Sequence, residues 1–196
     1  FNSGEYDVSG FLFLNSNHEI KKLELDQVAL GNYFKGEAVL TFGGVEKPDV
    51  LIIKGPLYDY SNSPDYHIKS SNFDLEVKAD ISELRIMKNL VLNDFVGSFT
   101  YGNKLKGFGT GKLNNGPNIK LEVDAAKQVK KFKAYSDAAG DVLLKSNIYS
   151  SGYGGGIIFE LIQQPGKEIT GNIQVKNLRV IGAPFLTKLI SLTSVE

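Results

Sequence analysis

Few residues of this chain have the types and spacing that catalysis or metal binding requires. The sequence contains no cysteine and two histidines, His18 in a polar turn and His67 in a long polar loop. A zinc site needs three or four nitrogen, sulfur or carboxylate ligands held together, and no such cluster is visible. Asp65, His67 and Ser70 could suggest a catalytic triad, but they share one loop, and no strand–turn–helix pattern exposes the serine. The sequence therefore predicts neither a metal site nor a catalytic triad.

The acidic pairs and the tyrosines are better explained by structural roles than by catalysis or ligand binding. Asp74 and Glu76 are two residues apart, so on an extended strand they point to the same face. A solvated sheet surface explains such a pair better than two glycosidase carboxylates do. Tyr58, Tyr60 and Tyr66 could stack on sugars or bases, although tyrosines in such a loop usually anchor it. We therefore expect a protein that is not an enzyme and that needs no cofactor.

Composition narrows the class of partner. The 196 residues carry 22 basic and 22 acidic side chains, and this zero net charge removes the main electrostatic reason to expect nucleic acid. Without cysteine there is no disulfide framework. Many glycines and 12 Phe with 9 Tyr favour β structure. No apolar run approaches the ~20 residues of a membrane span. The chain starts at Phe1 and already has a strand pattern at Tyr6, so we expect a piece of a longer protein.

Strand patterns recur along the chain with turn residues between them, which is typical of antiparallel β structure. Every second residue is apolar over 73–81 and again over 119–125, and charged or polar residues mostly fill the gaps. The two apolar sets are Phe73, Leu75, Val77, Ala79 and Ile81, and Ile119, Leu121, Val123 and Ala125. Strict alternation requires one dry and one wet face. We therefore predict that both sets share one dry face.

Glycine marks a second feature of this region. Residues 95–101 and 104–113 have the pattern of a hairpin that turns at Gly102-Asn103. In its second strand Gly107, Gly109 and Gly111 lie on one face, which indicates a sharp bend or the close approach of another group. A phosphate loop is a poor interpretation, because no helix follows and no Gly-Lys-Ser/Thr occurs.

Two short helices and one boundary complete the expected organisation. Residues 136–148 change to a helical period, with Ser136 or Asp137 as a possible N-cap. A strand over 169–175 leads through Gly182-Ala-Pro184 to an apolar helix near 183–194. The polar stretch 55–71 is the best candidate boundary. It separates a β-meander segment, 1–60, from a segment 61–196, and one continuous sheet is expected to run through both.

The apolar face of this sheet must be covered. About a dozen strands at about 4.8 Å each make a sheet of roughly 50–60 Å, which two short helices cannot cover. The sheet therefore either closes on itself as a sandwich or barrel, or curls into a trough that meets an apolar ligand. The alternation of residues does not decide between these two.

Several short motifs resemble the C-terminal region of the AsmA-like proteins of Gram-negative envelopes, in particular the YhdP type, which are relatives of TamB. The match covers about the last 140 residues, with compatible strands before it, and none of its motifs is catalytic. The motifs are Ser136-Asp137-Ala-Ala-Gly140, Gly154-Gly155-Gly156, Ala183-Pro184 through Leu192-Thr-Ser194, and Gly55-Pro-Leu57-Tyr-Asp59-Tyr-Ser61.

This resemblance implies an all-β protein in which a long antiparallel meander curls into a taco-like half-barrel groove. It implies a periplasmic location, an inner-membrane anchor outside this chain, and conduction of phospholipid towards the outer membrane. Acyl chains are then the expected partner, with periplasmic or outer-membrane proteins as further partners. The expected lining is Phe73, Leu75, Val77, Ala79, Ile81, Leu105, Ile119, Leu121, Val123, Ile173 and Val175. The alternative is a structural or assembly scaffold that binds envelope proteins instead of lipid.

Overall fold

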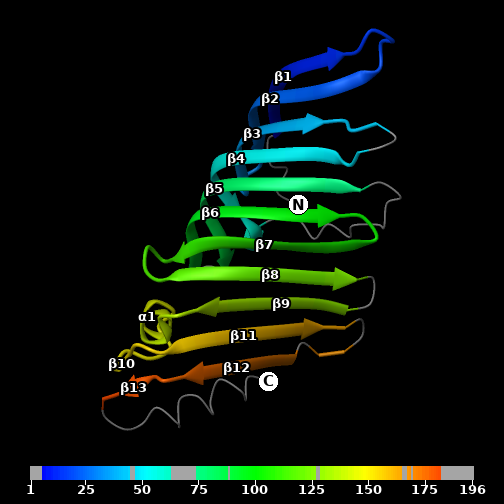
Figure 1. The fold of residues 1–196 in the computed structure, drawn as a ribbon. Helices are drawn as coiled ribbons and strands as arrows, with labels where there is room; N and C mark the ends of the chain where they lie inside the picture. The colour runs from blue at the N-terminus through cyan, green and yellow to red at the C-terminus, as the bar shows by residue number, and fades with distance from the viewer. Residues whose placement is uncertain are drawn as a thin grey trace.

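A computed structural model describes residues 6–44, 47–62, 74–87, 89–126, 129–164, 167–168 and 170–181. Eleven strands form one large sheet, and the fold is all-β as predicted (Figure 1). The strands of this sheet are β1 (Tyr6–Leu14), β2 (Ile20–Leu30), β3 (Phe34–Thr41), β4 (Asp49–Asp59), β5 (Leu75–Met87), β6 (Leu90–Tyr101), β7 (Lys104–Leu113), β8 (Asn118–Ala126), β9 (Val129–Ser136), β11 (Gly156–Gln163) and β12 (Thr170–Lys176).

The strand order follows the sequence from β1 to β12, with β10 left out. Neighbouring strands pair antiparallel except for β4 and β5, which are parallel, so the prediction of a purely antiparallel meander is wrong at this point. The polar stretch predicted as a boundary also has a different role. β4 continues to Asp59, and residues 60–74 connect it to a parallel neighbour. Parallel strands need a long crossover, which explains the length of this segment. The sheet is continuous across residue 60.

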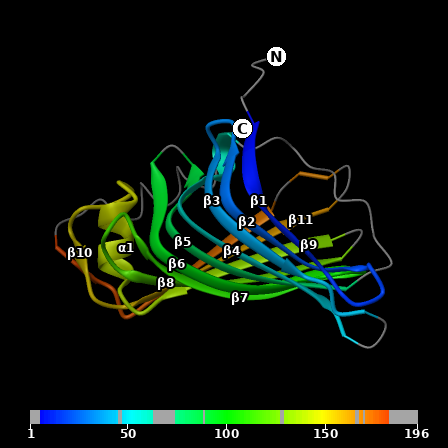
Figure 2. The same ribbon diagram turned by 90° about the horizontal axis from the view of Figure 1, so that it is seen from above.

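The long strands bend along their length, and the sheet forms an open trough (Figure 2). Register shifts add one residue to β2 between Leu25 and Val28, to β4 between Lys54 and Leu57, and to β6 between Asn93 and Val96. Such bulges bend a strand and increase its twist. Asp94 has a positive φ of 52°, which fits a bulge residue. Local irregularities in β2, β4 and β6 therefore contribute to the curvature.

Gly55 and Pro56 indicate a strand end in the sequence, but the structure places them inside β4. At this point β3 and β4 approach closely. A Cβ on Gly36 would lie 2.1 Å from the carbonyl oxygen of Lys54, and a Cβ on Gly55 would lie 2.1 Å from that of Lys35. Only glycine permits this approach, so the two glycines belong to the bend.

The short helix α1 (Ala139–Lys145) lies within the predicted range 136–148, at one end of β8, β9 and β11 (Figure 1). Its N-cap is Ala138, without a side-chain cap, so the predicted Ser136 or Asp137 cap is wrong. Gly154 and Gly155, both with positive φ, provide the missing acceptors: Ala139 N–H donates to the Gly155 carbonyl at 2.8 Å, and Gly140 N–H to the Gly154 carbonyl at 3.0 Å.

Two short strands, β10 (Gly152–Tyr153) and β13 (Arg179–Val180), pair beside this helix. The 3-10 turn η1 (Tyr60–Asn62) follows β4. The helix expected near 183–194 lies outside the described residues. Among the residues that the structure describes, no helix is long and apolar enough to cross a membrane.

The buried core follows the bend and continues under α1. Phe34, Ile81 and Phe95 are buried at 5% exposure or less. In the described part of the chain no second sheet covers them, so they must lie on the inside of the bend. The core residues nearer to α1 are Leu92, Leu113, Ile119, Ala139, Val142, Leu143 and Ile157.

Candidate functional site

Two rows of side chains cross all eleven strands on the face that carries the core. Residues that pair directly across neighbouring strands point to the same face, so the register defines each row. The first row is Leu12, Leu23, Leu40, Leu51, Val77, Phe99, Gly107, Val123, Phe132, Leu161 and Gly171. The second is Gly10, Leu25, Ala38, Ile53, Ala79, Gly97, Gly109, Leu121, Ala134, Phe159 and Ile173. Every member is apolar or glycine. We call these two rows the apolar rows, and their side of the sheet the apolar face.

The described lining residues all lie on this face. Val77, Ala79, Leu121, Val123 and Ile173 belong to the apolar rows themselves. Leu75 and Leu105 are in the next row, where both pair with Tyr101, and Ala125 pairs with Leu105. The others form a row beside the second apolar row: Ile81, which pairs with Phe95, Ile119, which pairs with Gly111, and Val175, which pairs with Ile157. Phe73 lies outside the described residues.

The apolar rows are open over much of their length. Leu12 is 55% exposed, Leu161 46% and Phe132 43%. Towards α1 the same face is closed, because Ile119 and Ile157 are buried and belong to one core cluster with Val142 and Leu143. The arrangement is an apolar trough about 48 Å across ten strand spacings, with a helix closing one side of it.

The glycines of β7 form the floor beneath two phenylalanine rings. A Cβ on Gly109 would lie 2.5 Å from the ring of Phe95, and one on Gly107 would lie 2.4 Å from the ring of Phe99. The two rings stack with centroids 6.4 Å apart. In the sequence these glycines indicated either a sharp bend or the close approach of another group. The structure shows the close approach, because the two rings lie against them. The rings of Phe95 and Phe99 therefore lie over β7.

Sequence reasoning missed the lining contributed by Phe95, Phe99, Phe132 and Phe159 and by the first four strands. The alternation in 95–99, with Gly97 between two phenylalanines, was a usable signal. In β2 the bulge between Leu25 and Val28 changes which residues face the trough, so a single alternating pattern does not describe that strand.

The opposite face is mostly polar, although the apolar side chains of Val96 and Phe108 are also exposed on it. Glu76, Lys78 and Glu122 lie on it, as the alternation predicted. A shallow hollow of about 810 Å³ crosses this face over β6 to β11. Two ion pairs lie in it: Lys133 is 3.1 Å from Glu160, and Lys106 is 3.8 Å from Asp124. Such exposed pairs add little stability, so this face has the character of a solvated sheet surface.

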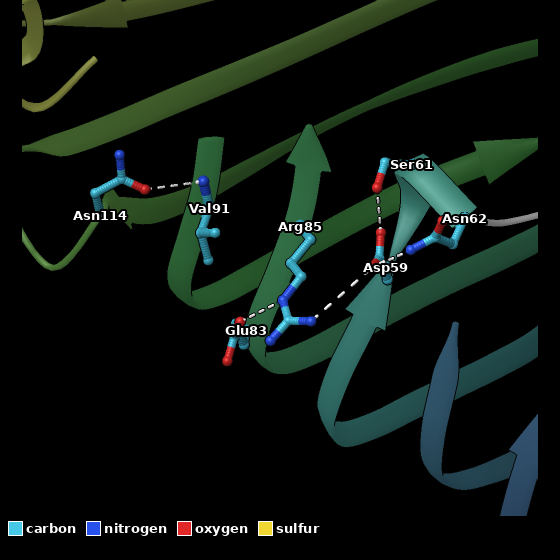
Figure 3. Close-up of polar contacts among 7 residues, drawn as sticks. All are labelled: Asp59, Ser61, Asn62, Glu83, Arg85, Val91 and Asn114. Atoms are coloured by element: carbon cyan, nitrogen blue, oxygen red, sulfur yellow. Dashed lines mark hydrogen bonds and ion pairs between the residues drawn. The ribbon is translucent and has the colours of Figure 1, made fainter. Parts of the chain in front are cut away.

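A polar network holds the end of β4 (Figure 3). The carboxylate of Asp59 accepts hydrogen bonds from Ser61 Oγ at 2.6 Å and from Asn62 Nδ2 at 2.9 Å. Arg85 lies 3.9 Å from the same carboxylate, and its Nε donates to Glu83 at 2.6 Å. Burial alone would raise the pKa of Asp59, but the hydrogen bonds from Ser61 and Asn62 and the charge of Arg85 together lower it. The Asp59–Ser61 motif therefore forms a cap that turns the chain out of the strand.

Asp59→Asn is expected to lower the free energy of unfolding by about 1–2 kcal/mol at neutral pH, because a charge-assisted acceptor is lost. The depressed pKa contributes stability that is present above the ordinary pKa of about 3.9 and is lost as pH falls through the folded-state value. The difference between the two proteins should therefore shrink in acid. Urea titrations from pH 7 to pH 3 measure it, with the exposed Asp80→Asn as control. A difference that stays constant with pH would contradict this role.

Asn114 links the turn between β7 and β8 to the start of β6 and to the end of α1. It has a positive φ of 47°, and its side-chain oxygen accepts from the Val91 N–H at 3.0 Å (Figure 3). Its amide nitrogen donates to the carbonyl of Lys145, the last residue of α1, at 2.8 Å. One side chain thus ties the start of β6 to the end of the helix, which fixes α1 at the end of the trough.

The residues considered first for chemistry form no site in the described part of the chain. His18 lies in the β1–β2 turn with a positive φ of 63°. Asp65, Tyr66, His67 and Ser70 lie outside the described residues. Within the described ranges, no group of three or more His, Asp or Glu side chains could hold a metal ion.

Comparison with known proteins found no similar protein. No family model, no curated protein and no solved structure matches the chain. The arguments for a function therefore depend on the geometry of the apolar face.

Proposed function

We propose that the chain is the lipid-binding module of a longer envelope protein and that its apolar face carries phospholipid acyl chains between the inner and outer membranes. The observation that supports this proposal is the pair of apolar rows that cross all eleven strands. A sheet that needed only a core would bury these rows under a second layer. Here the side chains of the rows remain half-exposed or exposed from β1 to β12, and only Gly97 and Gly109 are buried, beneath phenylalanine rings.

The chemistry of the rows suits acyl chains and no particular headgroup. Burial of apolar surface contributes about 25 cal/mol per Å², and the rows provide aliphatic and aromatic surface without a charge. A fixed headgroup site would need converging arginine or lysine side chains. Of the two arginines, Arg85 is paired with Glu83 and Asp59, and Arg179 lies on the separate strand β13. A trough without a headgroup site lets lipids of different classes move along it.

Photo-crosslinking tests the proposal. Leu121 and Glu122 are neighbours on β8 that point to opposite faces, so they form a matched pair. A benzoylphenylalanine at Leu121 should crosslink to phospholipid in bacterial membranes, and one at Glu122 should not. Val77 and Lys78 on β5 provide a second pair with the same expectation.

Mass spectrometry of the gently extracted protein is the complementary measurement. Bound phospholipid is the expected result. Equal crosslinking at both members of each pair, together with a mass free of lipid, would sink the lipid role and favour the scaffold alternative.

A further inference from the structure

One row of the apolar face carries charged and amide side chains beside apolar ones. It is the row of Leu75 and Leu105, next to the first apolar row, and we call it the rim row. From β4 to β11 its members are Asp49, Leu75, Tyr101, Leu105, Ala125, Lys130 and Gln163. The row lies at the strand ends opposite to α1, because β9 begins at Val129 and reaches α1 only after Ser136 (Figure 1). The rim row therefore borders the side of the trough that α1 does not close.

Lys130 and Gln163 are direct neighbours in the rim row. They pair across β9 and β11, which places their Cβ atoms about 5 Å apart, and both residues are exposed. The lysine ammonium provides N–H donors and a positive charge, and the glutamine amide provides further donors. One step further into the trough, the pair on the same two strands is Phe132 and Leu161, which are 43% and 46% exposed. Exposed apolar surface and exposed N–H donors thus lie side by side.

Within the part of the chain that the structure describes, no acidic side chain neutralises Lys130, since the ion pairs there involve other lysines. The one acidic member of the rim row is Asp49, which lies five strand spacings away, or about 24 Å. Its carboxylate accepts a hydrogen bond from the Gly43 N–H at 2.9 Å. On the polar face of the same strand, by contrast, Lys133 pairs with Glu160 at 3.1 Å. Lys130 therefore keeps its charge available to an anion on the apolar face.

We propose that Lys130, with Gln163 beside it, binds the phosphate group of a phospholipid whose acyl chains lie on the apolar rows. This assignment rests on the proposed function of the trough. The phosphodiester is common to the different phospholipid classes, so this contact holds the lipid without selecting its headgroup. A lysine can lay its methylene stem along apolar surface and keep its ammonium in water, which suits the boundary between acyl chain and headgroup. The headgroup then leaves the trough on the side away from α1.

Titration of the full chain with two lipids tests the contact. Pyrene-labelled phosphatidylglycerol carries its charge on the phosphate, and a pyrene-labelled diacylglycerol with the same acyl chains has no phosphate. Lys130→Gln should raise the Kd for phosphatidylglycerol about fivefold, because a charge-assisted hydrogen bond is lost, and should leave the Kd for diacylglycerol unchanged. Gln163→Leu removes a neutral donor and should weaken phosphatidylglycerol binding about threefold. Lys130→Arg retains the charge and should retain the affinity. The effect of Lys130→Gln should shrink at high salt, which screens exposed charges.

The matched control is Lys131→Gln. Lys131 is the next residue of β9, is exposed, and lies opposite Asp124 on the polar face. Its substitution should leave both Kd values unchanged, and far-ultraviolet circular dichroism verifies that each variant is folded. Equal effects of Lys130→Gln and Lys131→Gln on phosphatidylglycerol binding would overturn the proposal in favour of a general attraction by surface charge. Displacement of the lipid by millimolar inorganic phosphate at constant ionic strength would overturn it in favour of a site for free anions.

Two further results separate the phosphate contact from the lipid role itself. If the parent binds both lipids and Lys130→Gln binds phosphatidylglycerol as tightly as the parent does, the phosphate contact is refuted while the trough remains a lipid site. If the parent binds neither lipid, the proposed function fails and the phosphate contact fails with it.

Discussion

Leu121→Asp is expected to lower the affinity of the trough for acyl chains about thirtyfold while the sheet stays folded. Leu121 lies in the middle of the second apolar row, between Gly109 on β7 and Ala134 on β9. Neither neighbour has a side chain that can donate a hydrogen bond. In the empty trough water solvates the new carboxylate, because this position is only half-buried. A bound acyl chain would remove that water, and an unpaired polar group costs about 2 kcal/mol or more to bury.

The matched control is Thr110→Asp. Thr110 lies on the next strand, is exposed, and pairs with Lys120 on the polar face. The same carboxylate there should leave lipid binding unchanged. A pyrene-labelled phospholipid titrated into each folded variant measures the affinity, and bound lipid after purification provides a second readout. Equal affinities for the two variants would exclude the apolar rows as the lipid site.

The faces of the central strands could be predicted because alternation has a direct physical meaning. Leu75 to Ile81 and Ile119 to Ala125 alternate without a break, and a half-buried strand must place such residues on one side. Two intervening strands, β6 and β7, carry that side from one set to the other through Phe95, Gly97 and the β7 glycines. The shared face is therefore a consequence of pairing that the sequence pattern anticipates.

The rest of the trough could not be predicted, for two physical reasons. A bulge adds one residue and exchanges the faces of every residue after it, so alternation read through Leu25 and Val28 in β2 gives the wrong side. The second reason is that pairing is not local. The sequence shows that Gly109 has no side chain. Only the pairing of β6 with β7 shows that the ring of Phe95 fills the space that a side chain would take. The parallel pairing of β4 with β5 also depends on a crossover whose path the sequence does not reveal.

Gly140→Ala is expected to destabilise the protein by about 2–4 kcal/mol, against the direction of helix propensity. In an isolated helix this change stabilises by about 1 kcal/mol. Here a Cβ on Gly140 would lie 2.4 Å from the Cα of Tyr153 and 2.6 Å from the carbonyl oxygen of Gly152. Both are backbone atoms of β10, so relief requires α1 to move away. That movement stretches the hydrogen bonds of Ala139 and Gly140 to the Gly154–Gly155 turn and loosens the cover over Ile119 and Ile157.

Gly156→Ala is the matched control for this prediction. Gly156 begins β11 after the same glycine run, and its nearest obstacle to a Cβ is the Ser136 carbonyl oxygen at 3.6 Å, an ordinary contact. Its substitution should change the free energy of unfolding by less than about 1 kcal/mol. Urea denaturation of both variants gives the comparison. If Gly140→Ala is as stable as the parent, the helix is not held against β10 by the close approach that only glycine allows. If it unfolds early and Gly156→Ala does not, the Ser136–Gly140 and Gly154–Gly156 motifs act as one unit. In this unit Gly140 makes room for the backbone of β10, and the carbonyls of Gly154 and Gly155 accept hydrogen bonds from the start of the helix that closes the end of the trough.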